Sequence, residues 1–539
     1  MKLLRTLAIL LSLAGLYPAA SAQQVPIGQW RDELPYTLVN SLAEAGSRIY
    51  ASTPYAVFYY EKEDNSVVRI TKISGLSDIG ISCISYSPEY QVLVIAYTNA
   101  NIDLIKGSTV INISDIKRKQ ILGNKTINNI HFIGKDAYLS CGFGIVVLDV
   151  VKEEIGDTYY IGANGSQVNV LGLTMDDRDT LYAATEKGLY RAWQKDPNLS
   201  NYAVWKKDSR IDVNASYTAI TWFSGRVMVN KRPQQSDKDT ILIYANSAWS
   251  RFMSDAGAKV MNLTSNSQYL VVSYQYVVKA FNTGLSPYTN VPGAPFPLVA
   301  IADRDGMFWS GDNYTGLSNY NPATYQVNLV RLSGPNTALA FSMSSLGNDL
   351  YIAPGGRDGT YVPLYTQSQV YHYNNTDWVN IVPYENPVMA PTHDVVSVAA
   401  DPADPKRVYA ATFGTGLLEI YNDSVVRRFT RGNSTLMNYS GSDTSDIRIG
   451  GVAFDPEGSL WVVCSHTNQC LSMKKGEAWT SFSIPIEIDL GKIMIDRHGQ
   501  KWVQMRYGTM NANSVLVFTE NGTPNNPADD KYRLLNSSP

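Results

Sequence analysis

Short apolar stretches alternate with polar turns along almost the whole chain. The clearest repeating unit is an apolar stretch, a polar turn, an apolar aromatic stretch, a turn that contains glycine, and a third apolar stretch. It occurs at 39–62, 170–193, 298–321 and 395–422. Weaker copies begin near Ile81, Ile127, Thr218, Met261, Ala338, Gly450 and Ile493. Units repeated every 40–55 residues or so are typical of β-propellers with four-stranded blades.

One turn of the unit repeats an Asp-x-x-Gly-x-x-Trp motif. The aspartate side chain can cap the turn, glycine adopts a backbone conformation that other residues resist, and tryptophan begins the next buried strand. We interpret the motif as a structural turn between the first two strands of a blade. It resembles the Asp-box of sialidase-like propellers in form, but it is not a catalytic site. Its residues are Asp303, Gly306, Trp309, Asp455, Gly458, Trp461, Asp496, Gly499 and Trp502.

A tryptophan also marks predicted outer strands, at 28–36, 247–255, 376–384 and 477–485. The first of these segments contains Trp30 and precedes every inner strand. The pattern therefore predicts that this segment closes a first ring, as the outer strand of the unit that begins near Val299. The segment 325–334 is then predicted to lead a second ring. Four units follow it, so the second ring is predicted to be incomplete, although four blades could also form a small propeller.

The predicted fold is all-β, with tandem β-propellers of four-stranded blades, the first seven-bladed and the second incomplete. Lys2 and Arg5 precede an apolar run at 7–16 and small residues at 20–22, a pattern typical of a secretory signal peptide. The run is shorter than the roughly 20 residues of a membrane span, and no later segment is long enough. We expect a signal peptide at 1–22, a first propeller at 23–323 and blades of a second propeller at 324–539.

The composition supports a folded protein and excludes some functions. Hydrophobic residues make up 44% of the 539 residues and charged residues 17%, which is sufficient for large cores. The formal charge is −3 and no basic block occurs, so nothing indicates nucleic-acid binding. The 35 tyrosines and 10 tryptophans favour strands, and most of their rings are expected in blade cores. Some of these rings are suited to stack on sugars from the loops.

No pattern predicts a catalytic, metal or cofactor site. The histidines His131, His372, His393, His466 and His498 lack the spacing of metal ligands. The aspartates of the repeated turns belong to separate blades, whereas a glycosidase needs two carboxylates on one sugar. The glycine-rich segment 355–360 is predicted to be a surface loop. Cys464 and Cys470 flank a predicted turn, and the sequence leaves open whether they form a disulfide.

Three segments, at 75–105, 127–162 and 518–537, resemble the PorZ family of the type IX (Por) secretion system of Bacteroidetes. The resemblance implies two seven-bladed propellers followed by a C-terminal β-sandwich that serves as a secretion signal. The chain is predicted to end within the second propeller, so we expect the β-sandwich to be absent from it. We therefore expect a fragment or a truncated chain.

The resemblance also implies a function. Such proteins are non-enzymatic components of an attachment complex at the cell surface, together with the sortase-like peptidase PorU and outer-membrane proteins. The complex removes the C-terminal signals of secreted cargo and joins the cargo to anionic lipopolysaccharide, which the PorZ-like component is thought to present. No ligand residues can be carried over to this sequence.

The sequence leaves two other functional classes of protein open. The first is the periplasmic glycan-sensing region of a hybrid two-component regulator, which uses similar double propellers. The second is a propeller enzyme such as a polysaccharide lyase, which the lack of a catalytic pattern disfavours. Because propellers support many functions, the fold alone does not decide between these classes.

Overall fold

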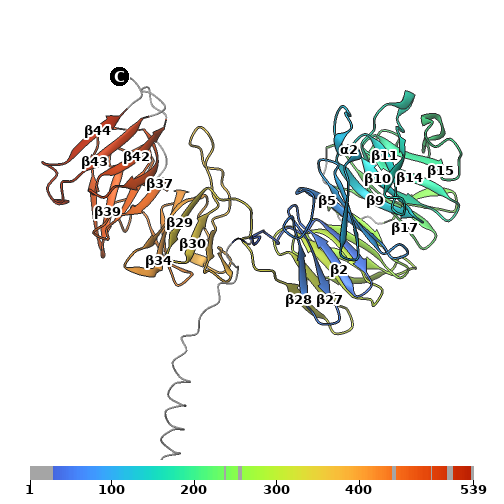
Figure 1. Cartoon of the computed structure of the whole chain (residues 1–539), viewed down its shortest axis with the longest axis horizontal. Helices are drawn as coiled ribbons and strands as arrows, with labels where there is room; N and C mark the ends of the chain where they lie inside the picture. The colour runs from blue at the N-terminus through green and yellow to red at the C-terminus, as the bar shows by residue number, and fades with distance from the viewer. Residues whose placement is uncertain are drawn as a thin grey trace, which may run out of the picture. The chain divides into compact units, whose positions relative to one another are not determined.

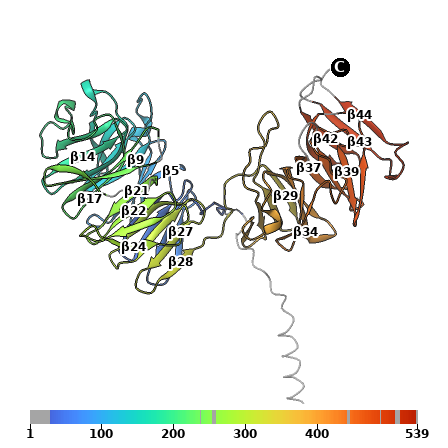
Figure 2. The same ribbon diagram turned by 180° about the vertical axis from the view of Figure 1, so that it is seen from behind.

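The computed structural model describes residue 28 and residues 30–235, 238–252, 258–439, 445–486, 488–506 and 514–535. The predicted signal peptide lies outside the described residues. The chain divides into a short N-terminal unit, Met1–Glu33, and a second unit, Leu34–Pro539, that holds all the described strands. Figures 1 and 2 show these strands as small twisted sheets from two opposite sides.

The first propeller consists of seven four-stranded antiparallel sheets, each built from four consecutive strands. They are β1–β4 (Ser41–Ala45, Arg48–Ser52, Val57–Glu61, Val67–Ile70), β5–β8 (Ile81–Ser87, Val92–Tyr97, Ile102–Lys106, Thr109–Ile113), β9–β12 (Ile127–Ile133, Asp136–Cys141, Gly144–Asp149, Glu154–Tyr159), β13–β16 (Val170–Met175, Thr180–Thr185, Gly188–Trp193, Lys206–Lys207), β17–β20 (Ser216–Phe223, Arg226–Arg232, Thr240–Ala245, Ala248–Arg251), β21–β24 (Val260–Ser265, Leu270–Tyr274, Val278–Phe281, Pro287–Val291) and β25–β28 (Pro297–Ala302, Phe308–Asp312, Leu317–Asn321, Gln326–Val330).

Four further blades make up the described part of the second propeller. They are β29–β32 (Ser342–Leu346, Asp349–Ala353, Val370–Tyr373, Trp378–Ile381), β33–β36 (Val395–Asp401, Asp404–Gly414, Leu417–Tyr421, Ser424–Phe429), β37–β40 (Ile447–Phe454, Leu460–Cys464, Leu471–Lys475, Ala478–Phe482) and β41–β44 (Asp489–Ile495, Lys501–Arg506, Val515–Thr519, Lys531–Leu535). Their inner strands follow one another in the order β29, β33, β37 and β41. The predicted all-β fold of tandem β-propellers with four-stranded blades is confirmed.

Helices are few and short in the described residues. They are α2 (Asp115–Arg118) and the 3-10 turns η1 (Ala163–Gly165), η2 (Tyr202–Val204) and η3 (Pro387–Met389). In the part of the chain that the structure describes, no helix is long and apolar enough to cross a membrane.

The second strand of each blade forms the core, because neighbouring blades cover both of its faces. Every residue of β6 and of β38 is buried, and both strands are continuous apolar runs. The outer strands are more exposed, as in β12 and β28, where only the last residue is buried. The apolar stretches of the repeat therefore correspond to the inner three strands of each blade.

The first ring closes by packing between its first and last blades. The inner strands contact one another in the order β1, β5, β9, β13, β17, β21 and β25, and β25 returns to β1. The Val39 amide donates to the Asp312 carbonyl at 2.9 Å, and the Gly316 amide donates to the Thr37 carbonyl at 2.8 Å. Tyr36, Val39, Leu42 and Phe58 share one core cluster with Trp309, Leu317 and Val330.

The predicted closure by the strand at Trp30 is wrong. The outer strand of the last blade is β28, which pairs with β27 along its whole length, so the segment 325–334 does not lead the second ring. Trp30 lies in no strand and is 85% exposed. A hairpin between consecutive strands closes a far smaller loop than a pairing across the whole ring, which favours β28 entropically. The other three tryptophan strands are confirmed as outer strands β20, β32 and β40.

Strand direction gives each propeller two distinct faces. Because neighbouring strands in a blade are antiparallel, the turn between the second and third strands lies on the same side as the start of the first strand. We call this side the top face of a propeller. The turn between the first and second strands, which includes the Asp-x-x-Gly-x-x-Trp motif, lies on the bottom face.

Candidate functional site

A cleft with a volume of about 660 Å³ lies on the top face of the second propeller. Five segments surround it: the β30–β31 connection, the residues before β33, the β34–β35 turn, the end of β36 and the start of β37. All five are top-face segments of three successive blades. Their side chains at the cleft include Tyr365, His393, Arg428, Arg431 and Asp446.

The buried carboxylate of Asp394 fixes one wall of the cleft. It accepts hydrogen bonds from the amides of Tyr365 at 2.7 Å and Thr366 at 2.9 Å, and from His393 Nδ1 at 3.1 Å. Burial opposes its charge, but the hydrogen bonds from His393 and Thr366 outweigh burial and hold the pKa of Asp394 below its ordinary value. The carboxylate therefore stays ionised and fully engaged within the protein, and it orients Tyr365 and His393.

Close backbone packing places the His393 ring at the base of the cleft. Gly414 has a φ of +147°, and a Cβ atom at this position would lie 2.3 Å from Cε1 of His393. Any side chain at Gly414 would therefore displace the imidazole. The His393 ring also lies 4.9 Å from the Tyr365 ring, whose side chain is 70% exposed at the rim.

Two arginines of the cleft have no anionic partner among the described residues. Arg428 is half-buried and Arg431 is exposed, and neither forms an ion pair with any described residue. In contrast, the neighbouring Arg427 pairs with Glu477 at 2.7 Å. The remaining acid at the cleft, Asp446, is already paired with Arg448 at 2.8 Å. The cleft therefore presents an exposed aromatic ring and two guanidinium groups that no described acidic side chain neutralises.

The three Asp-x-x-Gly-x-x-Trp turns share one geometry on the opposite, bottom faces. Asp303 accepts from the amides of Asp305 and Met307 at 3.0 and 2.9 Å, and from Trp309 Nε1 at 3.0 Å. The corresponding indole bonds are 2.8 Å from Trp461 to Asp455 and 3.0 Å from Trp502 to Asp496. The glycines Gly306, Gly458 and Gly499 have φ values of +82°, +77° and +75°. Each carboxylate is thus occupied by its own turn.

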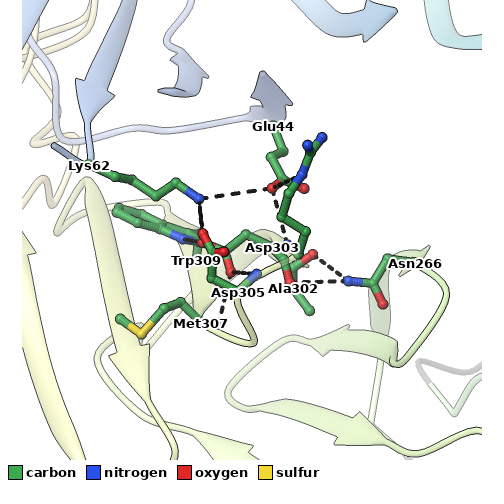
Figure 3. A network of polar contacts seen from close by, with 9 residues as sticks. Glu44, Lys62, Asn266, Ala302, Asp303, Asp305, Met307 and Trp309 are labelled. Carbon is green, nitrogen blue, oxygen red and sulfur yellow. Dashed lines mark hydrogen bonds and ion pairs between the residues drawn. The ribbon is translucent and has the colours of Figure 1, made fainter. Parts of the chain in front are cut away.

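The first of these turns also joins the ends of the first ring (Figure 3). Nζ of Lys62, which follows β3, lies 3.2 Å from Asp303 and 2.6 Å from Asp305. Glu44 on β1 pairs with Arg304 at 3.2 Å. Burial opposes the charge of Lys62, but the bond to Asp305 and the attraction of Asp303 raise its pKa overall. This network is structural, because it connects blade to blade.

The other candidate residues lie apart from the cleft. His372 is held between Asp349 at 3.1 Å and Asp423 at 2.7 Å, and stacks on Tyr351 at 4.2 Å. The pKa of the His131 imidazole is lowered to about 4 by burial. Among the described residues, no group of three or more histidine, cysteine or acidic side chains could hold a metal ion.

The disulfide that the sequence left open is not formed in this structure. Cys464 and Cys470 are both free and buried, at the two ends of the β38–β39 turn. Burial raises the pKa of the Cys464 thiol to about 11 and that of Cys470 to about 12. Both thiols therefore serve as small apolar side chains in the core.

A second top-face feature belongs to the first propeller. Tyr276, Phe296 and Tyr314 are 62%, 41% and 61% exposed and come from the turns and strand starts of its last two blades. The Phe296 ring lies 5.6 Å from the Tyr276 ring and 5.1 Å from the Tyr314 ring, nearly perpendicular to each. We call these residues the aromatic trio. Such exposed, mutually supported rings are suited to stacking on a sugar.

Sequence reasoning missed the cleft residues. The segment 355–360 was predicted as a surface loop, and it lies in the connection that carries Tyr365 to the cleft. Arg428, Arg431 and His393 belong to no motif. The only available signal was their common position near the top face: His393 and Arg431 lie in top-face loops, and Arg428 lies near the top-face end of β36.

The fold and this site define a tandem β-propeller protein. Its top faces carry a cleft lined by arginines and the exposed aromatic trio, which are features suited to ligand binding. A family model described as "TSS9, PorZ, N-terminal beta-propeller domain" matches residues 49–206. The solved structure of PorZ from Porphyromonas gingivalis, described as an essential bacterial surface component of the type IX secretion system, is similar to the chain with a TM-score of 0.81. It is 24% identical, and the match covers 94% of this chain and 68% of PorZ. The predicted resemblance to PorZ is confirmed.

Two further solved structures come from B. thetaiotaomicron. One is the extracellular domain of a protein assigned as a one-component system, with 12% identity, 94% and 73% coverage and a TM-score of 0.40. The other belongs to a protein assigned as a hybrid two-component system, with 13% identity, 94% and 71% coverage and a TM-score of 0.41. No curated protein sequence matches the chain.

Proposed function

We propose that this protein is a non-enzymatic cell-surface component of the attachment complex of a type IX secretion system. Its partners would be the sortase-like peptidase PorU and outer-membrane proteins of the complex, and its ligand anionic lipopolysaccharide. The observation that carries the proposal is the PorZ family-model match over residues 49–206. The likeness to the solved PorZ structure extends the shared fold over both propellers.

The site geometry supports binding rather than turnover. The cleft offers two cationic groups without an acidic partner among the described residues, and the aromatic trio offers exposed rings. Both features suit an acidic polysaccharide. The carboxylates of the repeated turns are occupied by their own backbone and indole donors, so they do not converge on one substrate. We also propose that the first propeller ends with β28, so that the domain boundary falls between Val330 and Ser342.

Deletion of the gene tests this function in the bacterium that encodes it. We expect type IX cargo to keep its C-terminal signals and to be released instead of attached, and a gene copy to restore both steps. The purified protein should retain anionic lipopolysaccharide without altering it and should co-purify with the sortase. Normal cargo processing in the deletion strain, with loss of growth on one polysaccharide, would refute the secretion role and favour a glycan sensor.

A further inference from the structure

We propose that the cleft on the top face of the second propeller binds one acidic sugar residue. Arg428 and Arg431 would hold its carboxylate or phosphate group, and Tyr365 would stack on its ring. The proposal deepens the proposed function and rests on it only for the biological source of the sugar. The binding itself is argued from the cleft alone.

The strongest support is that Arg428 has no ion-pair partner among the described residues. Arg428 is half-buried as a residue, and its guanidinium group is open to the cleft, where an anion can bind it with charge-assisted hydrogen bonds. The adjacent Arg427 has such an anion in Glu477, at 2.7 Å. No described residue provides one for Arg428 or Arg431, although both line the same cleft. An anion from outside the chain would complete the arrangement.

The described acids near the cleft, Asp446 and Asp394, do not compete for this role. Asp446 already pairs with Arg448 at 2.8 Å. Asp394 is buried and engaged by the Tyr365 and Thr366 amides and by His393. Two positive groups therefore face an open space of about 660 Å³, which is within the usual range for a ligand pocket.

The wall of the cleft favours a sugar over a bare anion. Tyr365 is 70% exposed, and its ring is supported by the His393 ring at 4.9 Å. An exposed ring held in one orientation loses little entropy when a flat apolar sugar face stacks on it. The hydroxyls of Thr415 and Thr430 also line the cleft and can bond to sugar hydroxyls.

Calorimetric titration of the whole chain tests the proposal with defined probes. The probes are trigalacturonic acid, which carries carboxylates, glucose 6-phosphate, neutral maltotriose and inorganic phosphate. We expect one of the two acidic sugars to bind at least about tenfold more tightly than either maltotriose or phosphate, since bonds to a charged partner are the stronger ones. Binding should weaken as salt is added. The preferred probe identifies the acidic group.

Variants locate the site. Arg428→Gln and Arg431→Gln should each weaken binding of the preferred probe about tenfold or more, and Tyr365→Ala should weaken the acidic sugar but not the phosphate. Arg191→Gln is the matched control, because Arg191 is an exposed arginine of the first propeller. Arg428→Lys should recover part of the affinity, because lysine restores the positive charge but not the bidentate N–H donors of the guanidinium group. Unchanged melting temperatures would show that these variants fold.

Several results would overturn the proposal. They are no binding of either acidic sugar, equal binding of maltotriose, and unchanged affinity in the Arg428→Gln, Arg431→Gln double variant. Equally tight binding of a hexaglutamate peptide through the same arginines would assign the cleft to acidic peptides instead. Cargo processing in the deletion strain is a separate readout, so failure of the cleft and failure of the secretion role can be told apart.

Discussion

The tryptophan of the Asp-x-x-Gly-x-x-Trp turn depends on the following blade for its burial, and this dependence can be tested within the second propeller. Trp461 on β38 is fully buried, because Phe518 and Lys501 of the next blade cover it, at 6.1 and 3.9 Å from its ring. Trp502 on β42 makes the same indole bond within its own turn, yet it is 37% exposed. The two tryptophans therefore differ in how much of the ring is covered by neighbouring side chains, and they do not differ in the indole bond of their turns.

Substitution by alanine should therefore affect the two positions unequally. Trp461→Ala should lower the free energy of unfolding of the second propeller by about 3–5 kcal/mol, as for other buried aromatic residues. It also removes the ring beneath Nζ of Lys501, whose side chain is fully buried. Trp502→Ala should lower the unfolding free energy by less than about half as much, because part of its ring already contacts water.

Trp461→Phe separates packing from hydrogen bonding. The phenyl ring keeps most of the apolar contacts but cannot donate to Asp455, so a buried carboxylate oxygen loses its partner at 2.8 Å. Loss of a bond to a charged group should cost about 1.5–3 kcal/mol. Trp461→Phe should therefore recover only part of the stability that Trp461→Ala loses.

Urea unfolding followed by hydrogen-exchange mass spectrometry provides the assay. Peptides of β37–β44 report the second propeller, and peptides of β1–β28 report the first as an internal control that neither substitution should change. Equal destabilisation by Trp461→Ala and Trp502→Ala would refute the reasoning, since it would mean that cover by the next blade contributes nothing.

Three further perturbations test other parts of the structure. Lys62→Met should lower the unfolding free energy of the first propeller by about 1–2 kcal/mol, because it removes the cation of the ring closure, and peptides of β1 and β25 should exchange faster. Burial opposes the charge of Asp78, but its bonds to Lys117 and Asn99 lower its pKa to about 2, so its stabilisation should be complete above pH 4 or so and be lost as the pH falls toward about 2. Asp78→Asn should flatten that part of the stability–pH curve, and an unchanged curve would contradict the assignment. Cys464 and Cys470 should react with iodoacetamide only after unfolding, and the intact mass without reductant should show free thiols; a mass lower by two hydrogens would indicate the disulfide.

The blades could be predicted from the sequence because the determinants of a blade are local. Apolar runs such as β6 and β38 are covered on both faces, and the turns between them contain residues with strong turn preferences. Each unit therefore carries its own strand order. Repetition along the chain then leads directly to a ring.

The closure of the ring could not be predicted in the same way. The pattern around Trp30 resembles that of a true outer strand such as β20, but a strand pattern does not specify which sheet it joins. The structure uses β28 for that position. Closure comes from Val39, Thr37 and the Lys62 network, which make single contacts between the first and last blades of the first ring. No repeat encodes such contacts.

The difference between repeated and unrepeated residues also explains why the cleft could not be predicted from the sequence. Repeated residues such as Asp303, Asp455 and Asp496 do the same structural work in each blade, and their bonds leave no free carboxylate oxygen for a ligand. Arg428 and Arg431 belong to no repeated motif. Their proposed role depends on the absence of an acidic partner among the described residues, which the structure shows and the sequence does not. In a propeller, ligand-binding residues are therefore expected among the top-face side chains that differ from blade to blade and have no partner within the fold.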